Sequence, residues 1–430
     1  MLWPLTTTRD SAGSLAIGGV SLTDLAHEVG TPLYIYDERT VRDSIRSYRT
    51  AFERHYPSTR VVYAGKAYLA GWLLTILEEE GLFLDVVSGG ELYVAHAAGF
   101  PMERVIFHGN NKTADELRLA LELGCGEIVI DNEHEIDLLE QLGPGVRNPL
   151  DVMLRISPGV DAHTHEYRKT GLIDSKFGLP IETGDAARAV ERIAGIRWLR
   201  LLGYHAHVGS QIFEVDPFVA ALGILFQFAA DMEERFGVEP LRMSPGGGLG
   251  IQYETTDPDV NVDEYASRLA DSVSTAVERY SLGKPELVVE PGRSIVGQAG
   301  VALYTVGAIK EIPGVRRYVS VDGGMADNIR PALYGARYSV ALANREAQGA
   351  QLVTVAGKYC ESGDVLIHDV ELPPLSPGDL LAIPAAGAYC LAMASNYNLA
   401  LRPAVVVVTD GRYRVVQRRE RNEDLLCRDV

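Results

Sequence analysis

The segment 61–68, VVYAGKAY, places a lysine at the end of a short apolar strand. The β-prone residues 61–63 precede Ala64 and Gly65, so we expect Lys66 at the mouth of the strand with its ammonium group directed into a pocket. A single lysine is more often a solvated surface charge. A partly desolvated lysine, however, is a usable amine nucleophile that forms Schiff bases with carbonyl compounds. The segment therefore predicts an amine nucleophile at position 66.

Two further motifs provide groups for an anion and for a ring nitrogen. SPGGGLG (244–250) carries Gly246, Gly247 and Gly248, whose backbone amides can approach a phosphate, although a plain flexible turn is the alternative. EPGRS (290–294) follows an apolar run. A buried carboxylate such as Glu290 needs a proton-bearing partner, which a pyridinium nitrogen would supply. A salt bridge from Glu290 to Arg293 or Arg155 is the alternative.

The histidines are candidates for stacking rather than for metal binding. HAHVGS (205–210) spaces His205 and His207 so that both lie on one face of a strand. Because no third and fourth ligands follow at a suitable spacing, we expect no metal site. A second His-x-His motif, DAHTH (161–165), stands in a polar segment and is expected at the surface. The flat imidazole of His207 suits stacking on an aromatic ring, with Ser210 as a nearby polar contact.

These groups together match one cofactor. An amine for a carbonyl carbon, a glycine turn for a phosphate, an imidazole for stacking and a carboxylate for a ring nitrogen are the four groups that pyridoxal 5′-phosphate requires. We therefore predict a pyridoxal phosphate site around Lys66.

The elements that must position these residues alternate between strands and helices. Short apolar runs, most of them separated by helical patterns such as 69–81 and 90–99, occur at residues 60–65, 82–87, 104–109, 127–131, 151–156, 201–209, 240–248 and 286–292. Eight units over roughly 240 residues predict a (β/α)8 TIM barrel. A doubly wound sheet would need fewer strands and a glycine fingerprint after the first one.

Polar groups lie at the C-terminal end of each of the eight runs, where a barrel places its active site. In chain order they are Lys66, Asp85, His108 with Asn110, Asp131, Arg155, His205 with His207, Gly246–Gly248, and Glu290 with Arg293.

From about residue 299 the pattern changes to alternating strands separated by Gly, Pro and Asp turns. This predicts an all-β domain, a β-sandwich or β-barrel, that follows the α/β barrel. The predicted limits are 38–298 for the barrel and 299–430 for the β domain. The strand at 31–37 precedes the barrel, so we expect the segment 1–37 to join the β domain.

Composition excludes several classes of protein. The chain has 430 residues and a formal charge of −18, which argues against binding to nucleic acid or to an anionic membrane. No apolar run is long enough for a membrane span, and the start of the chain lacks the pattern of a secretory signal. The cysteines 125, 360, 390 and 427 are widely spaced, which favours a reduced cytoplasmic protein.

Nine motifs resemble one family. In chain order, from about residue 25 to residue 408, they are LAHEVGTPLYIYD, YAGKAY, DVVSGGEL, HAHVGSQIF, PGGGLG, EPGRSIV, DGGMADNIRPALY, CESGD and GAYCLAMASNYN. On these motifs the chain is similar to the fold-type III pyridoxal-phosphate decarboxylases, and most closely to the diaminopimelate decarboxylases. Tyr68 and Cys390 depart from the usual pattern, in which an Asn and a small residue are common.

The resemblance assigns roles to individual residues. It implies that Lys66 binds the cofactor covalently, that His207 stacks on the ring and that Glu290 faces the ring nitrogen. It also implies a homodimer with shared sites, in which Cys360 of the partner subunit donates a proton. A lone cysteine is more often a small buried hydrophobe. The remaining cofactor-binding residues are expected to be Asp85, Ser210, Gly246, Gly247, Gly248, Gly292, Arg293 and Tyr389.

The reaction implied by the resemblance is decarboxylation of meso-2,6-diaminopimelate at its D-centre, which gives L-lysine and CO2 in the last step of lysine biosynthesis. Arg293, Arg330 and Tyr334 suit the distal carboxylate, Glu361 suits the distal ammonium group, and Tyr389 is a further substrate contact. The alternatives are decarboxylation of ornithine or carboxynorspermidine, racemisation, and a regulatory homologue without activity.

Overall fold

The computed structural model describes residues 1–11, 13–143, 149–159 and 175–430. The chain divides into two compact units, each described by itself below. The first unit comprises residues 1–44, 251–259 and 293–430, and the second comprises residues 45–250 and 260–292.

The second unit contains a closed barrel of parallel strands. Its eight staves are β5 (Thr59–Ala64), β6 (Phe83–Val86), β7 (Val105–Phe107), β8 (Glu127–Ile130), β9 (Leu150–Ser157), β11 (Leu199–His205), β12 (Arg242–Gly246) and β13 (Glu286–Val289). The sheet closes because β13 pairs with β5 and β8 pairs with β9. A two-residue strand, β10 (Leu179–Pro180), adds to the edge of β9. The predicted (β/α)8 barrel is confirmed.

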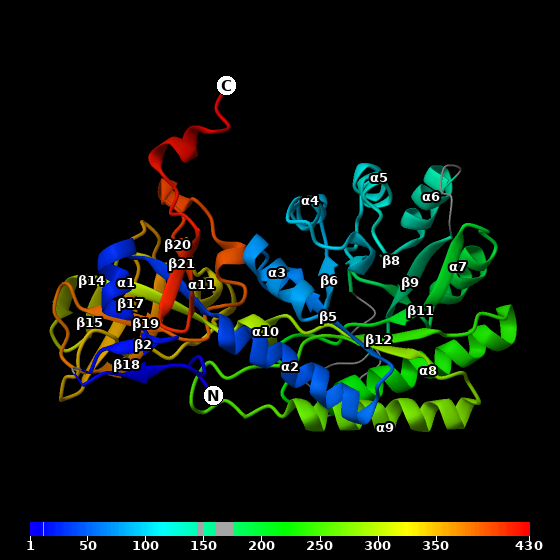
Figure 1. Cartoon of the computed structure of the whole chain (residues 1–430), viewed down its shortest axis with the longest axis horizontal. Helices are drawn as coiled ribbons and strands as arrows, with labels where there is room; N and C mark the ends of the chain where they lie inside the picture. Colours follow the sequence, from blue (N-terminus) through cyan, green and yellow to red (C-terminus); the bar gives the residue numbers. More distant parts are fainter. Residues whose placement is uncertain (12, 144–148, 160–174) are drawn as a thin grey trace. The chain divides into compact units, whose positions relative to one another are not determined.

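Helices follow most of the strands and surround the barrel (Figure 1). They are α3 (Gly71–Glu79), α4 (Gly89–Ala97), α5 (Ala114–Leu123), α6 (Glu133–Leu142), α7 (Asp185–Ala194), α8 (Asp216–Phe236) and α9 (Val262–Tyr280), after α2 (Glu38–His55), which spans the division between the units. Local sequence fixes their ends. At α5, for example, Thr113 and Glu116 form a capping box, and Gly124 ends the helix in the left-handed conformation.

The interior of the barrel is apolar, and its N-terminal end carries an ion-pair cluster. Buried residues of six strands form one core group: Val62, Ile106, Val129, Met153, Leu202 and Val288. Below it, Glu127 contacts the guanidinium groups of Arg242 and, at 3.9 Å, Arg60. Both arginines also pair with Glu286, at 2.7 and 2.9 Å. We infer that this cluster stabilises the N-terminal end, which leaves the C-terminal end for chemistry.

The first unit is built on a nine-stranded mixed sheet. Its strands are β4 (Leu33–Asp37), β14 (Gly300–Ile312), β15 (Arg316–Val321), β16 (Ala341–Leu342), β17 (Gln351–Ala356), β18 (Val365–Leu372), β19 (Leu380–Ile383), β20 (Ala404–Thr409) and β21 (Arg412–Gln417). All five residues of β4 are buried, because it lies between antiparallel β14 and parallel β20. The predicted second β domain is confirmed as a mixed sheet.

Smaller elements complete the first unit. A three-stranded sheet consists of β1 (Thr8–Arg9), β2 (Leu15–Ile17) and β3 (Val20–Ser21). The helices are α1 (Leu22–Val29), whose N-cap is Ser21, α10 (Arg293–Val296) and α11 (Arg330–Tyr334).

The predicted domain limits of 38–298 and 299–430, with 1–37 joined to the β domain, stay predictions. The compact units divide at residues 44/45 and 292/293, and residues 251–259 belong to the first unit. One reason is Tyr253, whose carbonyl accepts a hydrogen bond from the Ser339 amide and whose ring packs edge-on against Tyr338. Within the described residues, no helix has the length and apolar character that a membrane span requires.

Candidate functional site

A cavity of about 560 Å³ opens at the C-terminal ends of the barrel strands. The residues that line it include Lys66, Asp85, His108, Arg155, His205, His207 and Glu290. These residues lie in or directly after the C-terminal parts of six different strands, and only the closed barrel brings them together.

Lys66 lies on a one-turn 3-10 helix, Gly65–Ala67, directly after β5. The residue lines the cavity, and its side chain is exposed. The expected partial desolvation of its amine stays a prediction. Gly65 permits the close approach of β5 to β6, because a Cβ atom there would lie 2.8 Å from the Asp85 carbonyl oxygen. The strand end therefore presents the amine at the mouth of the cavity, within reach of a ligand.

Glu290 follows β13 and has a hydrogen-bond partner at each of its carboxylate oxygens. Its Oε2 lies 3.0 Å from His205 Nε2, and its Oε1 accepts a hydrogen bond from Ser244 Oγ at 3.2 Å. Burial raises the pKa of Glu290, but the imidazoles of His205 and His108 outweigh it and hold the pKa below its ordinary value. Among the described residues, Arg155, one of the alternative partners predicted for Glu290, pairs with Asp131 and not with Glu290. The pairing of Glu290 with Arg293 stays a prediction.

Asp85 and His108 lie next to this carboxylate. His108 Nε2 is 3.7 Å from Glu290 Oε1 and 4.0 Å from Asp85 Oδ1. Burial and the charge of Glu290 raise the pKa of Asp85 to about 8, while burial lowers the pKa of His108 well below its ordinary value. Near neutral pH, therefore, Glu290 is charged and Asp85 is largely protonated.

His207 lies beyond the end of its strand. β11 ends at His205, so the prediction that both histidines share one strand face is wrong. His207 is half-buried and lines the cavity. Burial and the cations of Lys66 and Arg155 lower its pKa to about 3, so its ring is a neutral flat surface at physiological pH. Ser210, in the loop that follows, is exposed.

The triple-glycine loop after β12 packs too closely for side chains. A Cβ atom on Gly247 would lie 1.9 Å from the Glu290 carbonyl oxygen, and one on Gly248 would lie 2.2 Å from that of Gly209. The Gly246 amide donates to Ser244 Oγ at 3.1 Å, whereas the amides of Gly247 and Gly248 donate to no other described residue. Two such amides beside the cavity residues are what an anion-binding loop requires.

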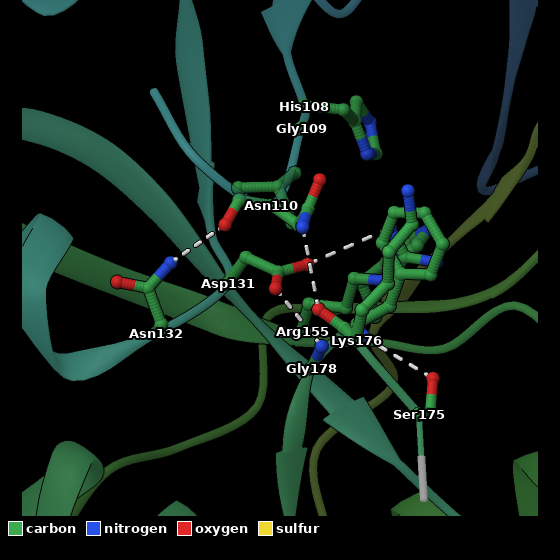
Figure 2. Close-up of polar contacts among 12 residues, drawn as sticks. His108, Gly109, Asn110, Asp131, Asn132, Arg155, Ser175, Lys176 and Gly178 are labelled. Carbon is green, nitrogen blue, oxygen red and sulfur yellow. Dashed lines mark hydrogen bonds and ion pairs between the residues drawn. The ribbon is translucent and has the colours of Figure 1, made fainter. Parts of the chain in front are cut away.

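Arg155, near the end of β9, lies between a carboxylate and an aromatic ring. Its guanidinium is 3.6 Å from Asp131 Oδ1 and stacks over Phe177 at 4.4 Å. Figure 2 shows Asp131 between Arg155 and Gly178, whose amide donates to Asp131 Oδ2 at 3.0 Å. The carbonyl of Lys176 accepts from the Asn110 side chain at 3.5 Å. These contacts attach the segment 175–178 to the C-terminal end of the barrel.

The first unit contains the other predicted site residues, among them two arginines. Arg330 is 7% exposed, donates to the Tyr338 hydroxyl, and lies 4.7 Å above the ring of Tyr253. Arg293 donates to the Tyr253 hydroxyl at 2.5 Å and lies 4.8 Å above the ring of Tyr389. No carboxylate among the described residues pairs with Arg330, so its buried charge is available to an anion.

Other predicted residues of this unit are exposed. Cys360, Glu361 and Tyr334 all lie at the surface, and Tyr334 is 64% exposed. The Cys360 backbone is fixed, because its amide donates to Asn398 Oδ1 at 2.9 Å. Gly292, in the second unit, is buried, and a Cβ atom there would lie 3.0 Å from Ala64. The roles predicted for all these residues stay predictions.

The expectation that no metal binds also stays a prediction. Among the described residues, His108, His205 and Glu290 form one group whose ligand atoms all lie within 4.8 Å of one another. Sequence spacing did not reveal this group, because its members come from three strands. The DAHTH motif, predicted at the surface, lies outside the described residues.

Comparison with known proteins identifies the family. Residues 40–297 match the family model described as pyridoxal-dependent decarboxylase, pyridoxal binding domain. The chain is 48% identical to the diaminopimelate decarboxylase of Bacillus subtilis, over 99% of this chain and 97% of the relative. It is 44% identical to that of Mycobacterium tuberculosis, over 100% and 98%.

A solved structure agrees with these relatives. The diaminopimelate decarboxylase of M. jannaschii in co-complex with L-lysine superposes with a TM-score of 0.92 at 33% identity, covering 100% of this chain and 99% of that chain. The family model spans more than half of the chain, and the relatives span nearly all of it. The resemblance predicted from the motifs is thereby confirmed, and the chain belongs to the pyridoxal-dependent decarboxylase family.

Proposed function

We propose that this chain decarboxylates meso-2,6-diaminopimelate at its D-centre and releases L-lysine and CO2, the last step of lysine biosynthesis. The observation that carries the proposal is its 48% identity to a diaminopimelate decarboxylase over 99% of the chain, together with a barrel mouth that gathers the required groups. The cofactor is pyridoxal 5′-phosphate.

The residues of the second unit fit this cofactor. The Lys66 amine would attach its carbonyl carbon, and the Gly247 and Gly248 amides suit its phosphate, together with Ser210 and Gly292. The neutral ring of His207 would stack on the pyridine ring, and the Glu290 carboxylate would pair with the ring nitrogen. When bound, the cofactor supplies a conjugated ring that accepts the electron pair left by departing CO2.

The residues of the first unit would recognise the substrate. Arg330 combines burial with the absence of a carboxylate partner among the described residues, and it suits the distal carboxylate. Arg293, Tyr334 and Tyr389 are further predicted contacts, and Glu361 suits the distal ammonium group. Ornithine has no distal carboxylate and would leave the buried charge of Arg330 unpaired.

The proposal includes a homodimer in the cytoplasm with shared active sites. Cys360 is exposed on a fixed backbone, and two large apolar residues, Tyr397 and Leu399, are exposed near it in the chain segment that binds its amide. Cys360 of the partner subunit would transfer its thiol proton to the carbon that has lost CO2. An exposed thiol beside apolar surface is consistent with a contact that only the dimer completes.

The experiment is an assay of purified protein with pyridoxal phosphate and either meso-diaminopimelate or ornithine. We expect equal amounts of CO2 and L-lysine from diaminopimelate, and loss of activity and of the visible absorption band in Lys66→Ala. Lys284→Ala, at an exposed loop lysine of the same unit, is the matched control and should behave as wild type. Turnover of ornithine alone, or full activity of Lys66→Ala, would refute the proposal.

Shared sites are tested by mixing two inactive variants, Lys66→Ala and Cys360→Ala. If each site uses both subunits, random mixing restores about 25% of wild-type activity, because half of the dimers contain one intact site. No recovery after verified subunit exchange would exclude sharing.

A further inference from the structure

His205, His108 and Ser244 have no role in the proposed reaction. Together with Glu290 they form a buried group at the barrel mouth. His205 is 2% exposed, His108 is 4% exposed, Glu290 is 7% exposed and Ser244 is fully buried. A buried carboxylate remains charged only when hydrogen bonds replace its lost hydration. The arrangement around Glu290 should therefore show which neighbours keep it charged.

His205 holds one oxygen of the carboxylate in a defined way. Its Nε2 lies 3.0 Å from Glu290 Oε2, and its Nδ1 has no hydrogen-bond partner among the described residues. A proton on Nε2 makes a hydrogen bond and leaves only a lone pair unpaired on Nδ1. The opposite tautomer would place two acceptors face to face and bury an unpaired N–H group, which is costly. The contact thus fixes the proton on Nε2.

Ser244 holds the other oxygen and connects it to the glycine loop. Its hydroxyl accepts the Gly246 amide at 3.1 Å, so its own hydrogen is directed to Glu290 Oε1 at 3.2 Å. Both oxygens of Glu290 therefore have a donor. The orientation of the carboxylate is fixed from two adjacent strands, β11 and β12.

His108 provides a second imidazole contact. Its Nε2 is 3.7 Å from Glu290 Oε1 and 4.0 Å from Asp85 Oδ1, and its ring meets that of His205 edge-on, with centroids 4.9 Å apart. It therefore separates the two carboxylates and supports the ring of His205. The ionisable groups that interact with this cluster from other elements include Lys66, Asp85, Lys112, Arg155, His207 and Tyr265.

We propose that His205 and His108 are positioning residues that keep Glu290 ionised and correctly oriented, so that the pyridine nitrogen of the cofactor stays protonated. The inference rests on the proposed function, because it concerns the group that faces the ring nitrogen. His205 acts through a direct hydrogen bond, and His108 acts through its contacts with Glu290 and with the His205 ring. Loss of His205 should therefore have the larger effect.

The decisive measurement uses pyridoxal phosphate labelled with 15N in the ring. Bound to the unmodified chain, its nitrogen should show the chemical shift of a protonated pyridine throughout about pH 6 to 9. In His205→Leu, which removes the donor, the shift should move to that of the unprotonated ring within this range. His205→Gln, whose side-chain amide can donate from a similar position, should restore the protonated shift.

Turnover gives a second, independent readout. We expect His205→Leu to lower kcat roughly 10- to 100-fold, as expected for a lost hydrogen bond to a buried charge, with a smaller change in KM. His108→Leu should lower kcat by less, and His205→Gln should recover most of it. His96→Leu, at an exposed position of α4, is the matched control and should leave kcat and the 15N shift unchanged.

A third measurement observes the His205 side chain of the unmodified protein and uses a substitution only to assign its signal. In the unmodified, cofactor-free chain labelled with 15N-histidine, the His205 signal, assigned by its loss in His205→Gln, should show a protonated Nε2. An unprotonated Nε2, or a ring nitrogen that stays protonated in His205→Leu at wild-type kcat, would overturn the proposal. Stoichiometric zinc bound by the purified chain and lost in His205→Gln would also overturn it, in favour of a metal site.

These outcomes are separable from failure of the proposed function. If the unmodified chain does not decarboxylate diaminopimelate, the assignment of the reaction fails, but the 15N shifts still report on Glu290. If the chain is active and the shifts do not respond to His205, the positioning role alone fails.

Discussion

Replacement of Arg330 by alanine tests whether a buried guanidinium selects the substrate. Arg330 is held by the Tyr338 hydroxyl and lies over the rings of Tyr253 and Tyr338, at 4.7 and 5.5 Å. No carboxylate of the described residues neutralises it. We therefore expect the substrate's distal carboxylate to be its ionic partner, and the variant should lose that interaction.

The size of the effect follows from burial. Because Arg330 is only 7% exposed, its interaction with an anion is weakly screened by solvent. Loss of one partner from a desolvated ion pair costs about 2–4 kcal/mol. This corresponds to a decrease in kcat/KM for meso-diaminopimelate of roughly 30- to 900-fold.

The assay compares two substrates that differ only at the distal end. D-Lysine has the same reacting centre as meso-diaminopimelate but lacks the distal carboxylate. Arg330→Ala should greatly reduce kcat/KM for diaminopimelate and change that for D-lysine by less than about threefold. Arg337→Ala, at an exposed arginine that pairs with Glu254, is the control. If Arg330→Ala discriminated between the two substrates as well as wild type does, the reasoning would be refuted.

Three further predictions concern other residues. Glu127→Gln leaves the arginines at the N-terminal end of the barrel without their buried partner, so chemical denaturation should show a loss of about 3 kcal/mol in the free energy of unfolding, with kcat nearly unchanged. A large decrease in kcat with an unchanged free energy of unfolding would contradict this prediction. The pKa of Asp85 is raised to about 8, so its protonated form stabilises the folded state fully below about pH 4, and this contribution disappears as pH rises to 8. In the cofactor-free protein, Asp85→Asn should therefore show a weaker fall in stability between these pH values, and an unchanged slope would be contrary to the prediction. Cys360→Ala should lower kcat about 10²- to 10⁴-fold, the usual contribution of a general acid, without changing the visible absorption of the bound cofactor. Wild-type turnover in this variant would exclude Cys360 as the proton donor.

The barrel was predictable from sequence because its strands are short apolar runs with polar groups after them. All four residues of β8 and three of the four of β6 are buried, so periodicity and burial agree. In the β domain the pattern is weaker, since the burial of strand β18 alternates irregularly over Val365–Leu372. The end of β11 was placed too late. The hydrogen-bonded pairing of β11 with β12 ends near Ala206, whose amide donates to the Ser244 carbonyl at 2.8 Å.

The composition of the site was predictable, but its internal contacts were not. Lys66, His207 and Glu290 were singled out by residue type and by their place after apolar runs. The exposure of Lys66 depends on how far other elements reach over the side chain, which local sequence does not determine. Likewise, His205 and Glu290 are 85 residues apart, and only the pairing of β11, β12 and β13 brings them within a hydrogen bond.

Two buried glutamates show that the end of the barrel at which a carboxylate lies determines its role. Glu127 and Glu290 belong to the same closed sheet and are 2% and 7% exposed. Glu127 begins β8 and contacts two arginines of the chain, so its charge is neutralised permanently within the protein. Glu290 follows β13, accepts hydrogen bonds from a hydroxyl and an imidazole, and lines the cavity. A carboxylate without a cation of its own at the C-terminal end of the barrel can still pair with a cationic ring nitrogen, and this difference makes Glu290, rather than Glu127, the functional residue.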